Sequence, residues 1–242
     1  MLNSGERLDQ LLREKYEIIQ NDEVFSFSTD ALLLGEFTSV RNKDKVMDLC
    51  TGNGIIPLLL AYKSQSTIEG IEIQEALVEM AQRTLRHNRL EDQISIEHMD
   101  LKNVSNTYMP STFDVVTVNP PYFKENQQMQ HQKEAHKIAR HEILCTLEDV
   151  VKASKHLLKQ GGKLVMVHRA ERLMDVLSLY RQYNIEPKRL RMVYSTPKKT
   201  EAVTILVEGR SGGQVGLKVE QPFYIYDANG EYSAEMKAVY YG

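Results

Sequence analysis

The chain alternates between short apolar runs and longer segments in which apolar residues recur at helical spacing. Runs rich in apolar and β-branched residues predict strands at 44–49, 66–71, 94–96, 113–118 and 163–167. Helical spacing of apolar residues predicts helices at 55–62, 74–87, 142–158 and 171–183. Strands that alternate with helices predict right-handed crossovers and a parallel α/β sheet that is covered on both faces.

Three other regions complete the expected organisation. Strands at 189–194 and 202–207 are close enough in sequence to form an antiparallel pair. In the first 24 residues Leu8, Leu11, Leu12 and Tyr16 have helical spacing, and Asn229-Gly230 predicts a hairpin turn in the tail. We therefore divide the chain into an N-terminal extension with a capping helix, the α/β domain and a C-terminal tail with a hairpin: 1–40, 41–210 and 211–242.

Composition narrows the class of protein without naming it. The 242 residues are 42% hydrophobic and 26% charged, with a formal net charge of −3, as in an ordinary soluble globular protein. A nucleic-acid partner would therefore have to be bound by local basic patches. Cys50 and Cys145 are far apart and lack metal-ligand spacing, which indicates no metal site and fits a reducing cytoplasm. No signal-peptide core precedes the domain, and the longest apolar run, 54–62, is shorter than the roughly 20 residues that span a bilayer.

A glycine-rich turn follows the first predicted strand. Gly52 and Gly54 lie between this strand and a helix, as at the start of a nucleotide-binding βαβ unit. The third glycine of the pyrophosphate fingerprint is replaced by Pro57, which favours a cofactor that has an adenosine but no pyrophosphate. Glu72 ends the second strand 24 residues after Asp48, where a carboxylate would hold a ribose diol.

Two further strand ends carry polar residues. Asp100 follows the third strand, where it could cap a helix or accept the exocyclic amine of an adenine. The fourth strand stops at Asn119-Pro120-Pro121-Tyr122, because proline has no N–H to donate. The Asn119 amide oxygen and the Pro120 carbonyl could accept both protons of a planar amino group, and Tyr122 could stack on it. The carboxyl ends of parallel strands share one edge, so these residues predict one ligand site.

These motifs together resemble the class I S-adenosylmethionine-dependent methyltransferases that have an N-P-P-Y catalytic motif. The resemblance implies a Rossmann-like fold with a seven-stranded, mostly parallel sheet and an antiparallel last strand pair. It also implies S-adenosylmethionine as the cofactor and Asn119, Pro120, Pro121 and Tyr122 as catalytic residues. The cofactor-binding residues implied by the resemblance are Thr29, Asp30, Asp48, Thr51, Gly52, Gly54, Glu72, Ile73, Asp100, Leu101 and Asn119.

A narrower resemblance rests on the stretch from Phe25 to Leu34, on Ala139-Arg140-His141-Glu142 and on the chain length. It is similar to bacterial tRNA adenine-N6 methyltransferases, which modify the adenosine next to the anticodon of a valine tRNA. This resemblance implies tRNA as the partner. The candidate substrate-binding residues are Tyr122, Lys124, Lys137, Arg140, Arg189 and Arg191.

Four other functions remain open at this stage. The same catalytic loop would suit a guanine-N2 rRNA, a DNA adenine-N6 or a protein glutamine-N5 methyltransferase. The last usually has an extra N-terminal domain, whereas only about 40 residues precede the first strand here. A non-catalytic module that binds cofactor or RNA would not need Asn119 and Tyr122. The sequence leaves open whether the protein is a monomer or a homodimer.

Overall fold

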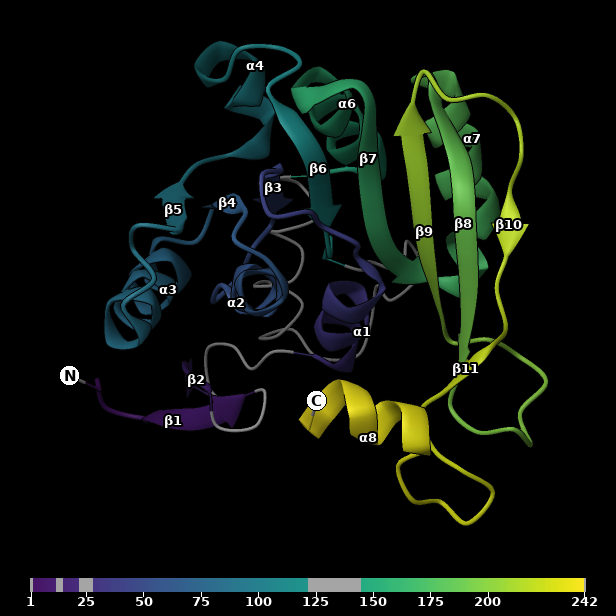
Figure 1. Cartoon of the computed structure of the whole chain (residues 1–242), viewed down its shortest axis with the longest axis horizontal. Helices are drawn as coiled ribbons and strands as arrows, with labels where there is room; N and C mark the ends of the chain where they lie inside the picture. The colour runs from purple at the N-terminus through teal and green to yellow at the C-terminus, as the bar shows by residue number, and fades with distance from the viewer. Residues whose placement is uncertain (1, 12–14, 22–27, 122–144, 242) are drawn as a thin grey trace, which may run out of the picture.

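The protein is built around one large β-sheet (Figure 1). The computed structural model describes residues 2–11, 15–21, 28–121 and 145–241. The sheet order is β10-β8-β9-β7-β6-β3-β4-β5, and β11 also pairs with β8. The strands are β3 (Lys45–Leu49), β4 (Thr67–Glu72), β5 (Ile94–His98), β6 (Phe113–Val118), β7 (Leu158–Arg169), β8 (Ile185–Tyr194), β9 (Thr204–Ser211), β10 (Lys218–Val219) and β11 (Phe223–Tyr224).

The strand directions confirm the expected sheet. Strands β3 to β7 pair in parallel, and β9 is antiparallel to both of its neighbours, β7 and β8. The seven predicted strands all form. The tail adds β10 and β11, each two residues long and parallel to β8. The sheet therefore extends beyond residue 210, into the segment expected to form a separate tail.

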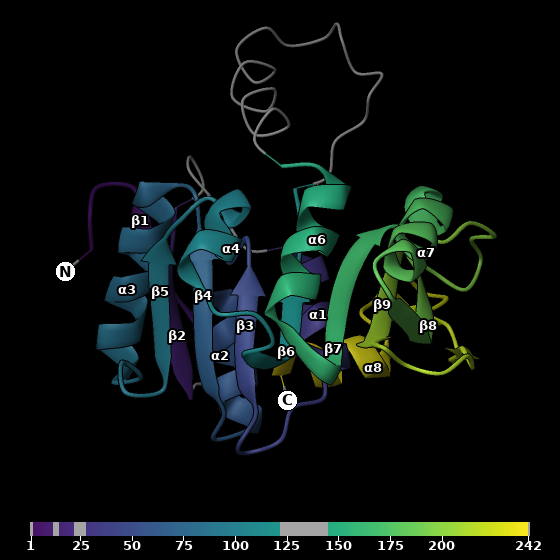
Figure 2. The same ribbon diagram turned by 90° about the horizontal axis from the view of Figure 1, so that it is seen from above.

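Helices cover both faces of the sheet, because successive strand residues point to opposite sides. Val46 packs in the core with the helices of one face, and Met47 packs in the core of the other. The first face carries α1 (Thr29–Phe37), α2 (Ile55–Lys63), α3 (Glu75–Asn88) and α8 (Ala234–Tyr241). The second carries α4 (Val104–Thr107), α6 (Leu147–Leu157) and α7 (Leu173–Gln182), which lie in front of the strands in Figure 2. Short 3-10 turns at Leu101–Asn103 and Ala170–Arg172 lead into α4 and α7.

The helical spacing near the N-terminus gave a wrong prediction. Residues 6–21 form an antiparallel hairpin of β1 (Glu6–Leu11) and β2 (Tyr16–Asn21). The hairpin packs on α3, where the Ile19 amide donates to Thr84 Oγ1 at 3.1 Å and Arg83 pairs with Glu6 at 2.5 Å. These partners lie more than 60 residues away in sequence. Contacts with a helix that distant in sequence are invisible to local spacing.

The expected hairpin in the tail is reduced to a single antiparallel bridge between Tyr226 and Tyr232. Gly230 between them has φ +87°, as the turn requires. The chain then forms α8, which buries Met236 and Val239 against the face that holds α1. None of the helices in the described part of the chain is long and apolar enough to cross a membrane.

Candidate active site

The strand register brings the predicted site residues to one edge of the sheet. Leu49 at the end of β3 pairs with Ile71 on one side and with Val118 on the other. Glu72 pairs with His98 near the end of β5. The turn at 50–54 and the residues after β4, β5 and β6 therefore leave the sheet at the same edge. This is the edge where parallel α/β sheets bind ligands.

The glycine turn has the backbone geometry that its residues suggest. Gly52 and Gly54 have φ values of +59° and +84°, a region that side chains with a Cβ rarely adopt. A Cβ on Gly54 would also stand 2.9 Å from Ile96 Cδ1, so the turn packs closely on its neighbours. Asn53 anchors the turn to the N-terminal hairpin through a 3.2 Å bond from Nδ2 to the Ile19 carbonyl. The turn is thus fixed from two sides before any ligand binds.

The Glu72 carboxylate joins two turns of this edge. Its Oε2 accepts from the Gly52 amide at 3.0 Å, and its Oε1 accepts from the Gln74 amide at 3.0 Å. The side chain is buried, at 5% exposure. Oε1 also accepts from Gln74 Nε2 at 3.4 Å, so the lone-pair direction that remains for a hydroxyl is on Oε2. The residue expected to hold a ribose therefore also fixes the glycine turn.

Asp48 is fully buried below the same turn. Its Oδ1 accepts from Thr117 Oγ1 at 2.6 Å. Burial raises the pKa of Asp48 to about 7, even though that hydrogen bond favours the charged form. Among the described residues, Asp48 Oδ2 and Asn53 Oδ1 are buried and accept no well-formed hydrogen bond, and the buried Thr51 hydroxyl lies near the Asp48 carboxyl and favours its charged form. Unsatisfied buried acceptors beside an open strand edge point to a ligand with donor groups.

Asp100 caps the 3-10 turn that follows β5. Its Oδ1 accepts from the Lys102 amide at 2.9 Å, which is the capping role considered from the sequence. Leu101 is buried, and the Ile73 carbonyl bonds the His98 ring at 2.8 Å. These contacts hold the loops after β4 and β5 side by side. That Asp100 also contacts an adenine stays a prediction.

Strand β6 ends at the same edge of the sheet. Asn119 is half-buried, Pro120 is buried and Pro121 is exposed. Because Val118 pairs with Leu49, Asn119 leaves the sheet next to the glycine turn. The remaining candidates of this loop, Tyr122, Lys124, Lys137 and Arg140, lie outside the described residues.

Helix α1 carries Thr29 and Asp30 to the same edge. Asp30 Oδ1 accepts from Thr204 Oγ1 at 3.2 Å, and Thr204 pairs with Arg169 at the end of β7. The residue at the N-cap position is Ser28, whose side chain makes no capping bond. Thr29 and Asp30 form the first turn of the helix.

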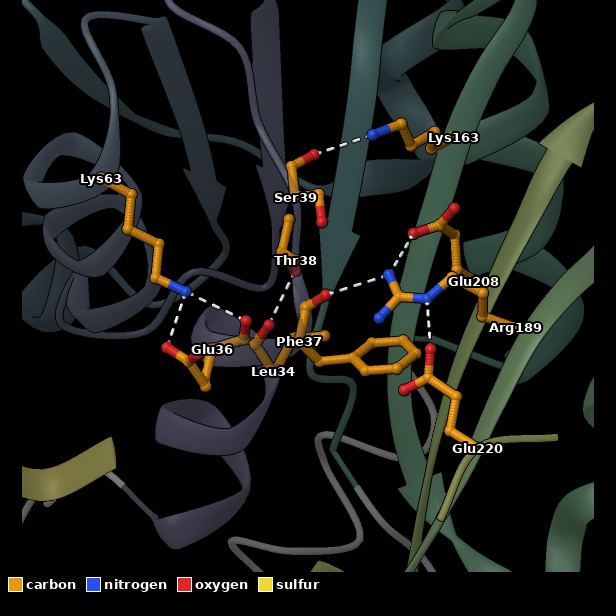
Figure 3. A network of polar contacts seen from close by, with 10 residues as sticks. All are labelled: Leu34, Glu36, Phe37, Thr38, Ser39, Lys63, Lys163, Arg189, Glu208 and Glu220. Atoms are coloured by element: carbon orange, nitrogen blue, oxygen red, sulfur yellow. Dashed lines mark hydrogen bonds and ion pairs between the residues drawn. The ribbon is translucent and has the colours of Figure 1, made fainter. Parts of the chain in front are cut away.

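The opposite end of α1 is fixed by three cations (Figure 3). Lys63 donates to the Gly35 and Glu36 carbonyls, and Lys163 donates to the Ser39 carbonyl at 2.8 Å. Arg189 donates to the Phe37 carbonyl at 3.3 Å, and its guanidinium lies 4.2 Å from the Phe37 ring centre. Cations at a helix C-terminus satisfy carbonyls that have no helical partner. Fixing this end of α1 holds Thr29 and Asp30 in place at the other.

Arg189 and Arg191 are the candidate substrate contacts that the structure describes. Arg189 bonds Glu208 at 2.9 Å and Glu220 at 2.7 Å, and Arg191 bonds Glu235 at 2.6 Å (Figure 3 for Arg189). Both lie in the middle of β8 rather than at its end. Their charges already have partners within the chain, and substrate binding by either residue stays a prediction.

Thr117 and Asn53 were not among the predicted site residues, yet both shape this edge. Thr117 is the polar residue in the otherwise apolar run Val115–Val118, which was a usable signal for a buried polar contact. Asn53 lies in the glycine turn, but its partner in β2 could not be read from the sequence.

His168, near the end of β7, is buried, which lowers its pKa to about 4 and leaves it neutral at pH 7.

Comparison with known proteins shows which family the chain belongs to. Residues 15–183 match the family model for the methyltransferase small domain, and the chain belongs to that family. It is a methyltransferase, and S-adenosylmethionine is its cofactor. The buried acceptors fit this cofactor, because it presents an ammonium group, ribose hydroxyls and an adenine amine as donors. No group of three or more His, Cys, Asp or Glu within the described ranges is arranged to hold a metal ion.

The chain is similar to proteins named tRNA1(Val) (adenine(37)-N6)-methyltransferase. That of Porphyromonas gingivalis is 28% identical over 233 residues, covering 92% of this chain and 89% of the relative. That of Parabacteroides distasonis is 26% identical over 187 residues, covering 76% of each chain. Among solved structures, a predicted O-methyltransferase from Agrobacterium tumefaciens aligns with a TM-score of 0.70 at 17% identity, covering 87% of this chain and 95% of that one. This last likeness concerns the fold.

Proposed function

We propose that the protein methylates the N6 amino group of an adenosine in tRNA, in the anticodon loop next to the anticodon. The observation that carries this proposal is the position of Asn119 and Pro120. They follow β6 directly beside the glycine turn of β3, because Leu49 and Val118 are paired. An amide oxygen and a backbone carbonyl would thus face the transferable methyl group. The relatives with the same named activity support the choice of tRNA.

Methyl transfer requires the adenine amino nitrogen to be more nucleophilic than it is in free adenine. S-adenosylmethionine supplies a methyl group on a positively charged sulfur. In an adenine, the N6 lone pair is delocalised into the ring. The Asn119 side-chain oxygen and the Pro120 carbonyl would each accept one amino proton, returning electron density to nitrogen and fixing its direction of attack. Tyr122 would stack on the ring.

The remaining residues of the edge have separate tasks. Glu72 would accept the ribose hydroxyls, Asp100 the adenine amine of the cofactor, and Asp48 and Asp30 would face its amino-acid end. A strong general base is unnecessary, because the methylated amino nitrogen becomes acidic and loses its proton afterwards. The neutral His168, with a pKa of about 4, is a weak base and suits this scheme.

The adenine must leave its stack to reach this edge, which costs a few kcal/mol in a duplex and less in a loop. Basic residues that follow the catalytic loop would supply affinity for phosphates: Lys124, Lys137 and Arg140. A tRNA substrate places the protein in the cytoplasm.

The test is methyl transfer from radiolabelled S-adenosylmethionine to total tRNA that lacks this modification, followed by nucleoside analysis. We expect the label in N6-methyladenosine. An Asn119→Ala protein run in parallel should bind the cofactor and leave the tRNA unlabelled. If the wild-type protein binds cofactor but leaves tRNA unlabelled, the tRNA proposal is wrong. Ribosomal RNA, DNA and protein glutamine are then the substrates to examine.

A further inference from the structure

Four tyrosine rings of the tail are in successive contact, and we call them the tyrosine ladder: Tyr226, Tyr232, Tyr240 and Tyr241. Tyr226 and Tyr232 are stacked, with ring centres 5.3 Å apart and planes 11° from parallel. Tyr232 and Tyr240 follow at 6.0 Å and 24°. Tyr240 and Tyr241 meet edge to face at 5.3 Å. The ladder is therefore an ordered array rather than a set of separate side chains.

Packing against the core does not explain the ladder. The tail is already anchored by Phe223, Met236 and Val239, which are 1%, 0% and 7% exposed. In contrast, Tyr226, Tyr240 and Tyr241 are 37%, 39% and 58% exposed. Only Tyr232 packs partly on the core. The ladder thus presents aromatic surface to solvent that the fold does not need for its stability.

A groove of about 560 Å³ begins where the ladder ends. Tyr240 forms one wall, and residues of the N-terminal hairpin form the rest. Apart from Leu8 these residues are polar or charged, and among them Asp9 accepts from Arg7 at 2.9 Å. An aromatic wall beside amide, carboxylate and guanidinium groups suits a planar ring with polar edges. It does not suit an apolar peptide side chain.

The other end of the ladder reaches the edge that holds the candidate active site. The Tyr226 amide donates to the Ser195 carbonyl at 2.8 Å, directly after β8. In this region Val193 of β8 pairs with Thr204, whose hydroxyl bonds Asp30. Figure 1 shows α8 lying between β11 and the N-terminal hairpin, so the tail links the two sites.

Two lysines lie at this end of the ladder, next to the loop that carries Asp227 and Glu231. Lys198 and Lys199 are exposed in the loop between β8 and β9, and Lys198 donates to the Ala228 carbonyl at 3.0 Å. Neither lysine forms an ion pair with any residue in the described ranges. Exposed rings beside unpaired cations are the combination that binds single-stranded nucleic acid, since the rings stack on bases and the cations contact phosphates.

We propose that the tyrosine ladder and the groove beyond it bind unpaired bases of the RNA substrate, away from the nucleotide that is methylated. This inference rests on the proposed function. Stacking between a base and an aromatic ring tolerates any base sequence, so the ladder contributes affinity and orientation rather than selection of the target adenine.

The experiment compares RNA binding by the wild-type protein, the double variant Tyr226→Leu/Tyr240→Leu and two controls. Leucine keeps apolar bulk but removes the aromatic face. Tyr62→Leu is the matched control, because Tyr62 is also 37% exposed but lies on α2, outside the ladder. Tyr240→Phe keeps the ring and should bind like the wild type. Affinity for unmodified tRNA is measured by fluorescence anisotropy, cofactor affinity by calorimetry and folding by thermal melting.

We expect the double variant to bind tRNA roughly tenfold more weakly or worse. Its cofactor affinity and melting temperature, and its methyl transfer at saturating tRNA, should match those of the wild type. Equal tRNA affinity for the double variant and the wild type would overturn the ladder proposal alone. The ladder proposal would also be overturned if Tyr62→Leu lost as much tRNA affinity as the double variant. The same holds if the double variant changed its oligomeric state but kept its tRNA affinity. If the wild-type protein binds no RNA at all, the proposed function fails together with the ladder.

Discussion

The two halves of the sheet use charged residues in opposite ways. At the ends of β3 and β4, Asp48 and Glu72 are buried carboxyl groups held by hydrogen bonds from Thr117 and from the Gly52 and Gln74 amides, and no cation in the described part of the chain bonds to them. In the middle of β8, the charge of Arg189 is divided between Glu208 and Glu220. One half keeps buried hydrogen-bond acceptors at the ligand-binding edge, whereas the other pairs its charge within the chain.

The different environments follow from where each residue lies along its strand. A polar residue just after a parallel strand reaches the open edge, where no neighbouring strand covers it. An arginine in mid-strand points at a sheet face, where it needs a partner because an unpaired charge there is costly. Four substitutions measure this difference, and the first three follow in order of expected effect.

Asn119→Ala should have the largest effect. Loss of the amide oxygen removes one acceptor for the amino protons, and we expect methyl transfer to fall about 10²–10³-fold. Cofactor affinity, measured by calorimetry, should stay within about twofold of the wild type. Activity within tenfold of the wild type would show that Asn119 does not activate the amino group.

Arg189→Met tests the other half of the comparison. It leaves Glu208, which is 6% exposed, without its cation, so we expect a loss of about 2–3 kcal/mol in the free energy of unfolding. Chemical denaturation measures the loss, and adding Glu208→Gln should restore part of it. If Arg189→Met keeps its stability but binds tRNA more weakly, Arg189 contacts the substrate, as predicted from the sequence, and the contrast between the two halves is wrong.

Glu72→Gln should weaken cofactor binding about tenfold, since an amide cannot accept from both the Gly52 and the Gln74 N–H groups and also from a ribose. Calorimetric titration with S-adenosylhomocysteine measures this change. The matched control is Glu220→Gln in the β8 half, whose cofactor affinity should equal that of the wild type. Equal losses in both variants would contradict the division between the halves.

The last prediction concerns the pH dependence of stability. Burial raises the pKa of Asp48 to about 7 in the folded protein, above its usual value of 3.8, so the folded state holds this proton more tightly. The stability from this group is therefore fully present below about pH 4 and is lost as pH rises towards 7. The wild-type protein should therefore lose roughly 1–3 kcal/mol of unfolding free energy through this group between pH 5 and pH 8. Asp48→Asn should not show this loss. If the unfolding free energy of both proteins changes equally with pH, the pKa of Asp48 is not raised.

Much of the fold followed from local patterns. The run 113–118 reads as a buried strand because both of its faces are covered, and Val115, Val116 and Val118 are all 0% exposed. The turn at 50–54 could be placed because positive φ at Gly52 and Gly54 demands glycine. The shared edge of the four strand ends then followed from parallel topology alone.

What local patterns missed depends on distant partners. Leu8 and Leu11 have helical spacing, but the hairpin they belong to is stabilised by Arg83 and Thr84 of α3. Arg189 looked like a free cation because Glu208 and Glu220 come 19 and 31 residues later. The partner of a side chain across a sheet or between elements is fixed by tertiary structure, which single-sequence patterns do not contain.

The strand order also has a consequence for synthesis of the chain on the ribosome. Strand β9 lies between β7 and β8, although β8 is made first. Until residues 204–211 emerge, β8 has no place in the sheet, and the edge of β7 stays unpaired. The nascent protein therefore completes its cofactor half well before its last strands. Its period of greatest aggregation risk falls between translation of residue 169 and residue 211.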